Sequence, residues 1–182
     1  MLVVISVVFF NQSGYLDSAA LSNLADDISS KAVQSQAYGI AVKELAPGSA
    51  NFSVAYGLSF SLLSSGSNTA YIYFADQNGN AVYDGGWGSC TPECLEETAI
   101  LRGNYIEDLC IIRSSGGDQC NNAKRADITY LRPALLARIS FFNNGGQQFN
   151  PSNAIGVRVK LKSPGGLSRS VAIYQSGQVS VQ

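Results

Sequence analysis

Four cysteines lie close together in the chain, at Cys90, Cys94, Cys110 and Cys120. An even number of cysteines in a polar stretch favours two disulfides over free thiols. A zinc site would need all four thiolates, because the chain contains no histidine, and the paired knuckles typical of such sites are missing. Four cysteines allow three pairings. We expect Cys94 to pair with Cys110, because two strands predicted around Arg102–Asn104 bring them close, and Cys90 to pair with Cys120.

Oxygen-bearing side chains alternate along a second stretch. They are Asp76, Asn78, Asn80 and Asp84. Ligands at alternate positions begin the calcium loop of an EF-hand, so the sequence predicts calcium as the one candidate cofactor. The loop glycine is replaced by Ala81 and the bidentate glutamate by Trp87, so that Glu93, Glu96 or Glu97 would have to supply a carboxylate. The alternative is an Asx-rich turn between strands, in which these side chains bond nearby N–H groups.

Basic residues gather in the last third of the chain. From Lys124 onward there are eight basic residues and one acid, Asp127. Arg158, Lys160 and Lys162 alternate along a predicted strand and therefore share one face. Such a face suits phosphate contacts with a polyanion such as nucleic acid, although aromatic residues are sparse there. The alternative is a solvated strand face that opposes an acidic neighbour.

The composition argues against an enzyme. Without histidine, the serine triad, cysteine–histidine pairs and histidine-based zinc sites are all excluded. The paired acids Glu96–Glu97 and Glu107–Asp108 could act as the two carboxylates of a glycosidase, but on a sheet surface such pairs are nearly always solvated. Charged residues make up 14% of the chain, well below the usual value of about 25%, which suits an exported or assembled protein.

A long helix is predicted over 17–44. Apolar residues recur there at intervals of three and four, as in a helix with one buried stripe. The stripe consists of Leu21, Leu24, Ile28, Ala32, Val33, Ala37, Ile40 and Ala41. Lys31 and small polar residues lie on the opposite side. Gly39 is expected to weaken the end of the helix by about 1 kcal/mol.

The rest of the chain reads as strands, with short apolar runs or strict alternation between turn signals. The predicted strands are 54–60, 70–74, 95–101, 106–112, 128–131, 139–142, 155–161, 170–174 and 178–181. The fold class expected from this order is α+β, with a long N-terminal helix packed on an antiparallel β-sheet head. We divide the chain into a helical region, 1–46, and a β-rich globular head, 47–182.

An apolar run, MLVVISVVFF, opens the chain. It is shorter than the roughly 20 residues that a membrane-spanning helix needs. It is consistent with a buried strand or with the remainder of a longer apolar helix. In the second case we expect the natural start to lie upstream of Met1.

The chain resembles type IV pilin-like proteins, the prepilins and pseudopilins. The run MLVVISVV followed by an amphipathic helix carries the first part of the resemblance. The stretches LADDISSKAVQSQAYGIAVKE, YIYFADQNGNAVYD, DITYLRP and SRSVAIYQSGQVSVQ look like the GspH/FimT-like minor pilins. The arginine-bearing tail GRxR, through which some of these proteins bind DNA, is replaced here by Gly177-Gln178-Val179-Ser180.

The resemblance implies a structural subunit of a type IV pilus or of a type II secretion-like filament. Such a subunit is held in the inner membrane by a single pass and then assembles with other pilin or pseudopilin subunits outside the cell. The residues expected to mediate assembly are Leu2, Val3, Val4, Ile5, Val7, Val8, Phe9 and Phe10. The alternative function is a secreted calcium- or DNA-binding module for adhesion or uptake.

Overall fold

The computed structural model describes residues 2–41, 45, 54–131 and 136–182, with side chains from Tyr15 onward. Within these residues one helix, α1 (Leu2–Ile40), precedes all the strands. The strands are β1 (Ala55–Ser61), β2 (Ala70–Asp76), β3 (Cys94–Ala99), β4 (Tyr105–Arg113), β5 (Gln119–Ala123), β6 (Arg125–Tyr130), β7 (Ala137–Phe142), β8 (Gln148–Phe149), β9 (Ala154–Lys162), β10 (Ser168–Tyr174) and β11 (Val179–Val181). Residues 2–10 of the opening apolar run therefore lie in the helix and not in a strand.

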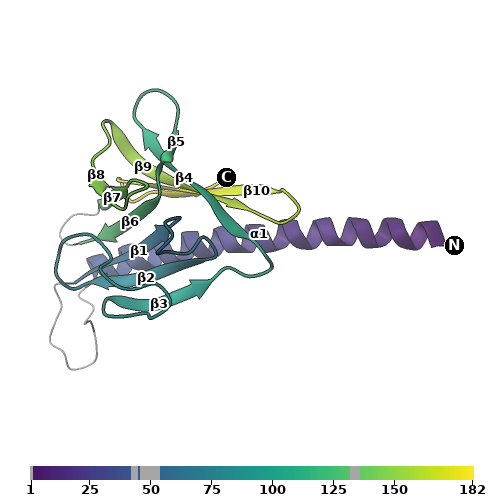
Figure 1. Cartoon of the computed structure of the whole chain (residues 1–182), viewed down its shortest axis with the longest axis horizontal. Helices are drawn as coiled ribbons and strands as arrows, with labels where there is room; N and C mark the ends of the chain where they lie inside the picture. Colours follow the sequence, from purple (N-terminus) through teal and green to yellow (C-terminus); the bar gives the residue numbers. More distant parts are fainter. Residues whose placement is uncertain (1, 42–44, 46–53, 132–135) are drawn as a thin grey trace.

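The strands form two antiparallel sheets (Figure 1). The first sheet has six strands in the order β3-β2-β1-β6-β7-β8, and the second has five in the order β11-β10-β9-β4-β5. Strands β1 and β6 form the centre of the first sheet, and Leu58 lies opposite Ile128 across them. In the second sheet β9 pairs with both β4 and β10.

The predicted α+β fold, with a long helix packed on one antiparallel sheet, is wrong. The described chain is mostly β, because eleven strands in two sheets accompany the single helix. The reason lies in strand pairing. Alternating residues indicate the two faces of a strand but not its neighbours: β3 pairs with β2, whereas the next strand, β4, joins β9 and β5 in the other sheet.

One hydrophobic core joins the helix to both sheets. From α1, Leu21, Ala25, Ile28 and Ala32 are buried in it, together with the inward side chains of both sheets. The helix contacts β1 and β6 of the first sheet and β9, β10 and β11 of the second. Burial of apolar surface on this scale is the dominant favourable contribution to folding, and it fixes the position of α1 relative to the head.

Gly39 allows the closest approach between helix and sheet. A Cβ atom at this position would lie 2.3 Å from the backbone carbonyl oxygen of Tyr130 in β6. Gly39 is still helical and is buried. The glycine that the sequence marks as a weak point of the helix therefore serves its packing.

Two expectations concern the ends of α1. The predicted boundary between residues 46 and 47 lies outside the described residues, and α1 ends before it, at Ile40. The single-pass membrane helix is not supported, because no helix within residues 2–41, 45, 54–131 and 136–182 has the length and apolar character to cross a bilayer.

Candidate functional site

Helix α1 is much longer than the part that packs on the head. It comprises 39 residues, or roughly 58 Å at 1.5 Å per residue. Among the helix residues from Tyr15 onward, whose side chains are described, the first buried one is Leu21. Figure 1 shows the N-terminal part of α1 running past both sheets, with the N-terminus far from the strands.

The face of α1 opposite the head has its own regular line of residues. Counted in alternate steps of three and four, the line comprises Leu16, Ala19, Asn23, Asp26, Ser30, Val33, Ala37 and Ile40. We call it the outward line. Ala19 is half-buried and the others are exposed. Steps of three and four are the spacing with which helices pair along a shared seam. The line is polar in its middle and apolar at both ends.

This arrangement corrects the predicted buried stripe of the helix. Ile28 and Ala32 are fully buried, as expected, but Val33 is 52% exposed and Ile40 is 39% exposed. Consecutive helical residues are about 100° apart. Val33 therefore cannot share the inward side with Ala32, and it begins the apolar end of a second face.

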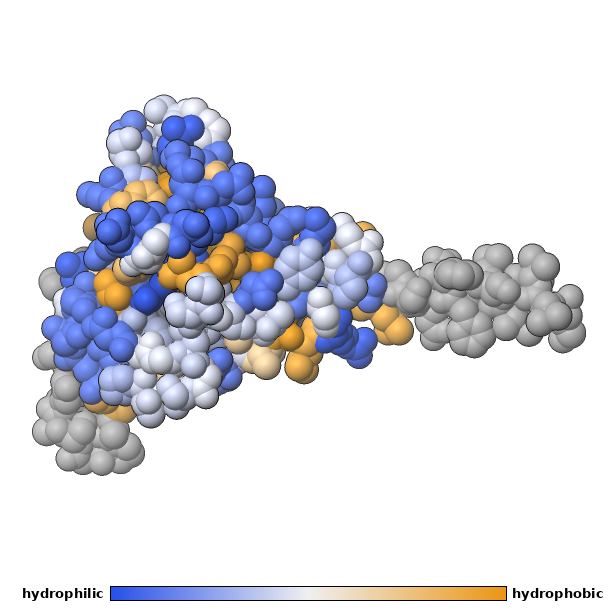
Figure 2. All heavy atoms as spheres, viewed as in Figure 1, coloured by the Kyte–Doolittle hydropathy of each residue, from blue (hydrophilic) through white to orange (hydrophobic). Residues whose placement is uncertain are grey.

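The head also exposes apolar surface, at the end from which the N-terminal part of α1 projects. Figure 2 shows apolar patches beside the place where the helix leaves the head. Leu16 of α1 and Leu101, which follows β3, are 45% and 72% exposed. A cavity of about 260 Å³ lies between α1 and the end of β3, and its lining includes Leu24 and Leu101.

The residues expected to mediate assembly precede this region. Leu2, Val3, Val4, Ile5, Val7, Val8, Phe9 and Phe10 all fall within α1. Their side chains lie outside the described part of the chain. Their role stays a prediction.

Polar contacts hold α1 at a fixed angle to the first sheet. The Tyr71 hydroxyl in β2 donates to the Asp27 carboxylate. Burial raises the pKa of Tyr71, and Asp27 raises it further, so the hydroxyl stays protonated. Lys31 Nζ lies 2.5 Å from Glu96 Oε2 in β3 and 5.6 Å from the centre of the Tyr73 ring. These contacts add to the shared core in attaching α1 to the head.

The predicted calcium residues form a tightly bonded loop between β2 and β3. Asp76 is 2% exposed, and its two oxygens accept the N–H groups of Gly79 and Ala81 at 2.7 and 2.8 Å. The Asn78 and Asn80 amides both donate to Asp84 Oδ2 at 2.6 Å. Most of the oxygens that calcium would need are already engaged, as in the Asx-turn alternative.

Glu93 closes the same loop from its far end. It is 3% exposed, and its carboxylate accepts the N–H groups of Gln77 and Asp84, both at 3.0 Å. Among the described residues, Asp76, Asp84 and Glu93 do not make up a group of carboxylates close enough to share a metal ion. The bound calcium stays a prediction, and the loop is organised without it.

A buried ion pair fastens the loop to the sheet. Asp127 is fully buried, and its oxygens accept from Ser59 Oγ at 2.6 Å and from the Tyr83 N–H at 3.0 Å. Arg125 Nη2 lies 2.5 Å from Asp127 Oδ2 and also donates to the Tyr83 carbonyl oxygen. Burial raises the pKa of the Asp127 carboxyl, and Arg125 opposes this shift. This contact was not predicted from the sequence. Its one local signal is the acid Asp127 among the mainly apolar residues of β6.

The loop also covers the outer face of the first sheet. Tyr83 packs with Ile72 and Phe74 in a small second core, and Trp87 and Cys94 pack against it. This cover explains why every residue of β2 is buried. Trp87 is half-buried, and so anchors the loop.

All four cysteines form disulfides, but not in the expected pairs. Cys90 is bonded to Cys94, and Cys110 to Cys120. The predicted pairing of Cys94 with Cys110 is wrong, because it relied on β3 and β4 being neighbours, and these strands lie in different sheets. One disulfide closes the end of the loop, and the other joins the neighbouring strands β4 and β5.

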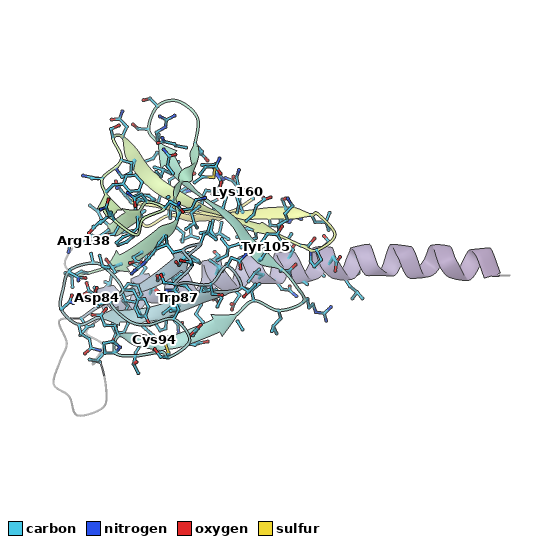
Figure 3. All side chains as sticks on the ribbon, in the orientation of Figure 1. Asp84, Trp87, Cys94, Tyr105, Arg138 and Lys160 are labelled. Carbon is cyan, nitrogen blue, oxygen red and sulfur yellow. A yellow bond between two sulfur atoms is a disulfide. The ribbon has the colours of Figure 1, made fainter. Side chains whose placement is uncertain are left out.

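The predicted polyanion face lies on β9 of the second sheet, where Figure 3 labels Lys160. Arg158 Nε lies 2.6 Å from Asp118 Oδ2, and Lys162 is paired with Glu107. These acids neutralise two of the three cations, as the solvated-face alternative expects. The geometry therefore gives little support to a polyanion site, which stays a prediction.

Comparisons with known proteins identify no relative. No family model, curated protein or solved structure matches the chain.

Proposed function

We propose that the protein is a structural subunit of an extracellular filament, of the pilin or pseudopilin kind, and that copies assemble through α1. The single observation that carries the proposal is the second face of this helix. The inward face packs on the head, and the outward line leaves Leu16, Val33 and Ile40 exposed. A helix that is apolar on two sides needs a second partner.

The outward line continues into the apolar run. The same steps of four and three, counted back from Leu16, fall on Gln12, Phe9, Ile5 and Leu2 in the sequence. A second copy of α1 is the partner we propose, because a helix with this spacing is complementary to a copy of itself. Such a contact would bury apolar residues worth about 25 cal/mol per Å² of apolar area.

Two further features suit a filament subunit. Both disulfides favour an oxidising compartment outside the cytosol. Fixed attachment of α1 to the head, through Asp27 and Lys31, means that contact between helices would also set the spacing of the heads. The head has two sheets, whereas the resemblance implies one, so the proposal depends on the helix and not on the head.

The calcium- or DNA-binding alternative has weaker support. The loop oxygens accept backbone N–H groups, and two of the three cations of the predicted face have acidic partners. A function in assembly requires neither ligand.

The test is self-association of the full chain with a charge placed on the outward line. Val33→Glu places a carboxylate in the proposed contact, where an unpaired charge is costly to bury. Sedimentation velocity in mild detergent should show oligomers for the unaltered chain and about tenfold weaker association, or none, for the variant.

Leu95→Glu is the matched control. Leu95 is 43% exposed and lies on β3, away from the outward line. It should associate as the unaltered chain does. Equal association of both variants would show that the apolar run aggregates without the outward line and would contradict the proposal.

A further inference from the structure

The end of the head opposite the helix N-terminus contains an open cavity of about 640 Å³. Its walls come from the β2–β3 loop, at Asn80 and Ala81, and from β7, β8 and the residue Gln175. Figure 3 shows Arg138 at this end, far from the projecting part of α1. The volume lies within the range of about 300–1,000 Å³ typical of small-molecule sites.

The floor of the cavity is held in place by hydrogen bonds. Ser140 Oγ donates to the Ala81 carbonyl oxygen at 3.1 Å and accepts from Gln148 Nε2 at 3.2 Å. Ser140 is buried. The loop wall is fixed separately by the Asp76 and Asp127 contacts. A site whose walls are ordered before binding loses less entropy when a ligand arrives.

Arg138 gives the cavity its charge. It is exposed on β7, and it makes no ion pair with any residue that the structure describes. Among the described residues that line the cavity none is acidic. An arginine in this setting can hold a carboxylate with two parallel hydrogen bonds.

The remaining lining is neutral and mixed. Asn150 and Gln175 present amides, each with donors and an acceptor. Phe149 and Ile139 add half-buried apolar surface, and Leu136 is 57% exposed. Amides suit a ligand with many hydroxyl groups, and apolar side chains suit the C–H face of a sugar ring. A nucleic acid backbone would need several cations, and the described lining offers one, Arg138.

We propose that the cavity beside Arg138 binds a saccharide that carries a carboxylate. Arg138 holds the carboxylate, the amides of Asn150 and Gln175 bond hydroxyl groups, and Phe149 contacts the ring. The site is independent of the outward line of α1. It lies at the end of the molecule opposite the projecting N-terminal part of α1.

The test is titration of the ¹⁵N-labelled protein with trigalacturonate, sialyllactose and a hyaluronan tetrasaccharide, followed by NMR. At least one of these should shift the side-chain amide signals of Asn150 and Gln175, at concentrations up to about 10 mM, where weak binding is still visible. The methyl ester of the sugar that binds should bind about tenfold more weakly, because it has lost the charge that pairs with Arg138.

Two variants test whether Arg138 holds the carboxylate of the sugar. Arg138→Gln should weaken binding by about tenfold or more, while Arg169→Gln, which removes an exposed arginine of the other sheet, should leave binding unchanged. Unchanged amide spectra confirm that each variant is folded. The proposal is overturned if none of the three sugars shifts these amides, if inorganic phosphate shifts them equally, or if both variants bind alike.

Discussion

The two long faces of helix α1 carry opposite environments. The inward face places Leu21, Ala25, Ile28 and Ala32 in the core, where each is at most 1% exposed. The outward line leaves Val33 and Ile40 in contact with solvent, although both are apolar. Scattered exposed apolar residues are common. Here, however, they are regularly spaced along one face of a helix that extends beyond its head, and this spacing indicates a partner.

The two faces have different roles, which the apolar pattern of the sequence does not distinguish. Inward residues determine how α1 is attached to its own head, and a change there should alter the free energy of unfolding. Outward residues should alter association between copies and leave unfolding unchanged.

The largest effect is expected for Ile28→Ala. Ile28 is fully buried in the core that joins α1 to the strands. Its truncation should lower the free energy of unfolding by roughly 2–5 kcal/mol, through lost burial and the cavity that remains. Urea unfolding with the disulfides intact measures this. A loss below 1 kcal/mol, a value expected for surface positions, would mean that α1 is not an integral part of the core.

A smaller loss is expected for Gly39→Ala. Helix propensity alone favours alanine by about 1 kcal/mol, but the new Cβ would lie 2.3 Å from the Tyr130 carbonyl oxygen. We expect a net loss of about 1–2 kcal/mol, because overpacking outweighs propensity. Ala37→Gly, at an exposed position of the same helix, calibrates the propensity on its own. A higher melting temperature for Gly39→Ala would contradict the close approach of α1 to β6.

The smallest loss is expected for Lys31→Met, between the two faces. Lys31 and Glu96 side chains are 21% and 49% exposed, so the pair should contribute at most about 1 kcal/mol. Lys31 lowers the pKa of Glu96, so the folded state binds fewer protons than the unfolded state. The contribution is therefore present above the ordinary glutamate pKa of about 4.3 and is lost as the pH falls through the folded value.

Unfolding midpoints at neutral and at acidic pH check this sign. The difference between Lys31→Met and the unaltered chain should shrink in acid, where Glu96 is protonated. A difference that grows in acid would show that the contact with the Tyr73 ring, and not the ion pair, governs the effect.

Local pattern predicts much of this fold. The helix and nine of the strands follow from periodicity, because side chains repeat every 3.6 residues in a helix and every two in a strand. The strands β5 and β8 were not predicted: Gln119–Ala123 is polar and lies on an edge, and Gln148–Phe149 is only two residues long. The pairing of strands into two sheets depends on contacts between distant residues, which local pattern does not contain.

The candidate site could also be predicted only in part, because its contacts join distant residues. The sequence indicates oxygen atoms at Asp76 and Asp84, but not their partners: Asp76 already accepts two backbone N–H groups, and Asp84 Oδ2 accepts the amides of Asn78 and Asn80. It indicates apolar residues in the helix, yet Val33 and Ala32 look alike until the inward face is known. Arg138 carries no local signal, because its significance comes from β8 and the loop beside it.

The most direct measurement of the central claim is photo-crosslinking from the outward line. A benzoylphenylalanine placed at Val33 of the full chain, in the same detergent solution, should give a crosslinked dimer whose peptides map to α1 of a second copy. The same residue placed at Leu95 should give none. Crosslinks from Val33 that map only to strands, or equal dimer yields from both positions, would contradict assembly through this helix.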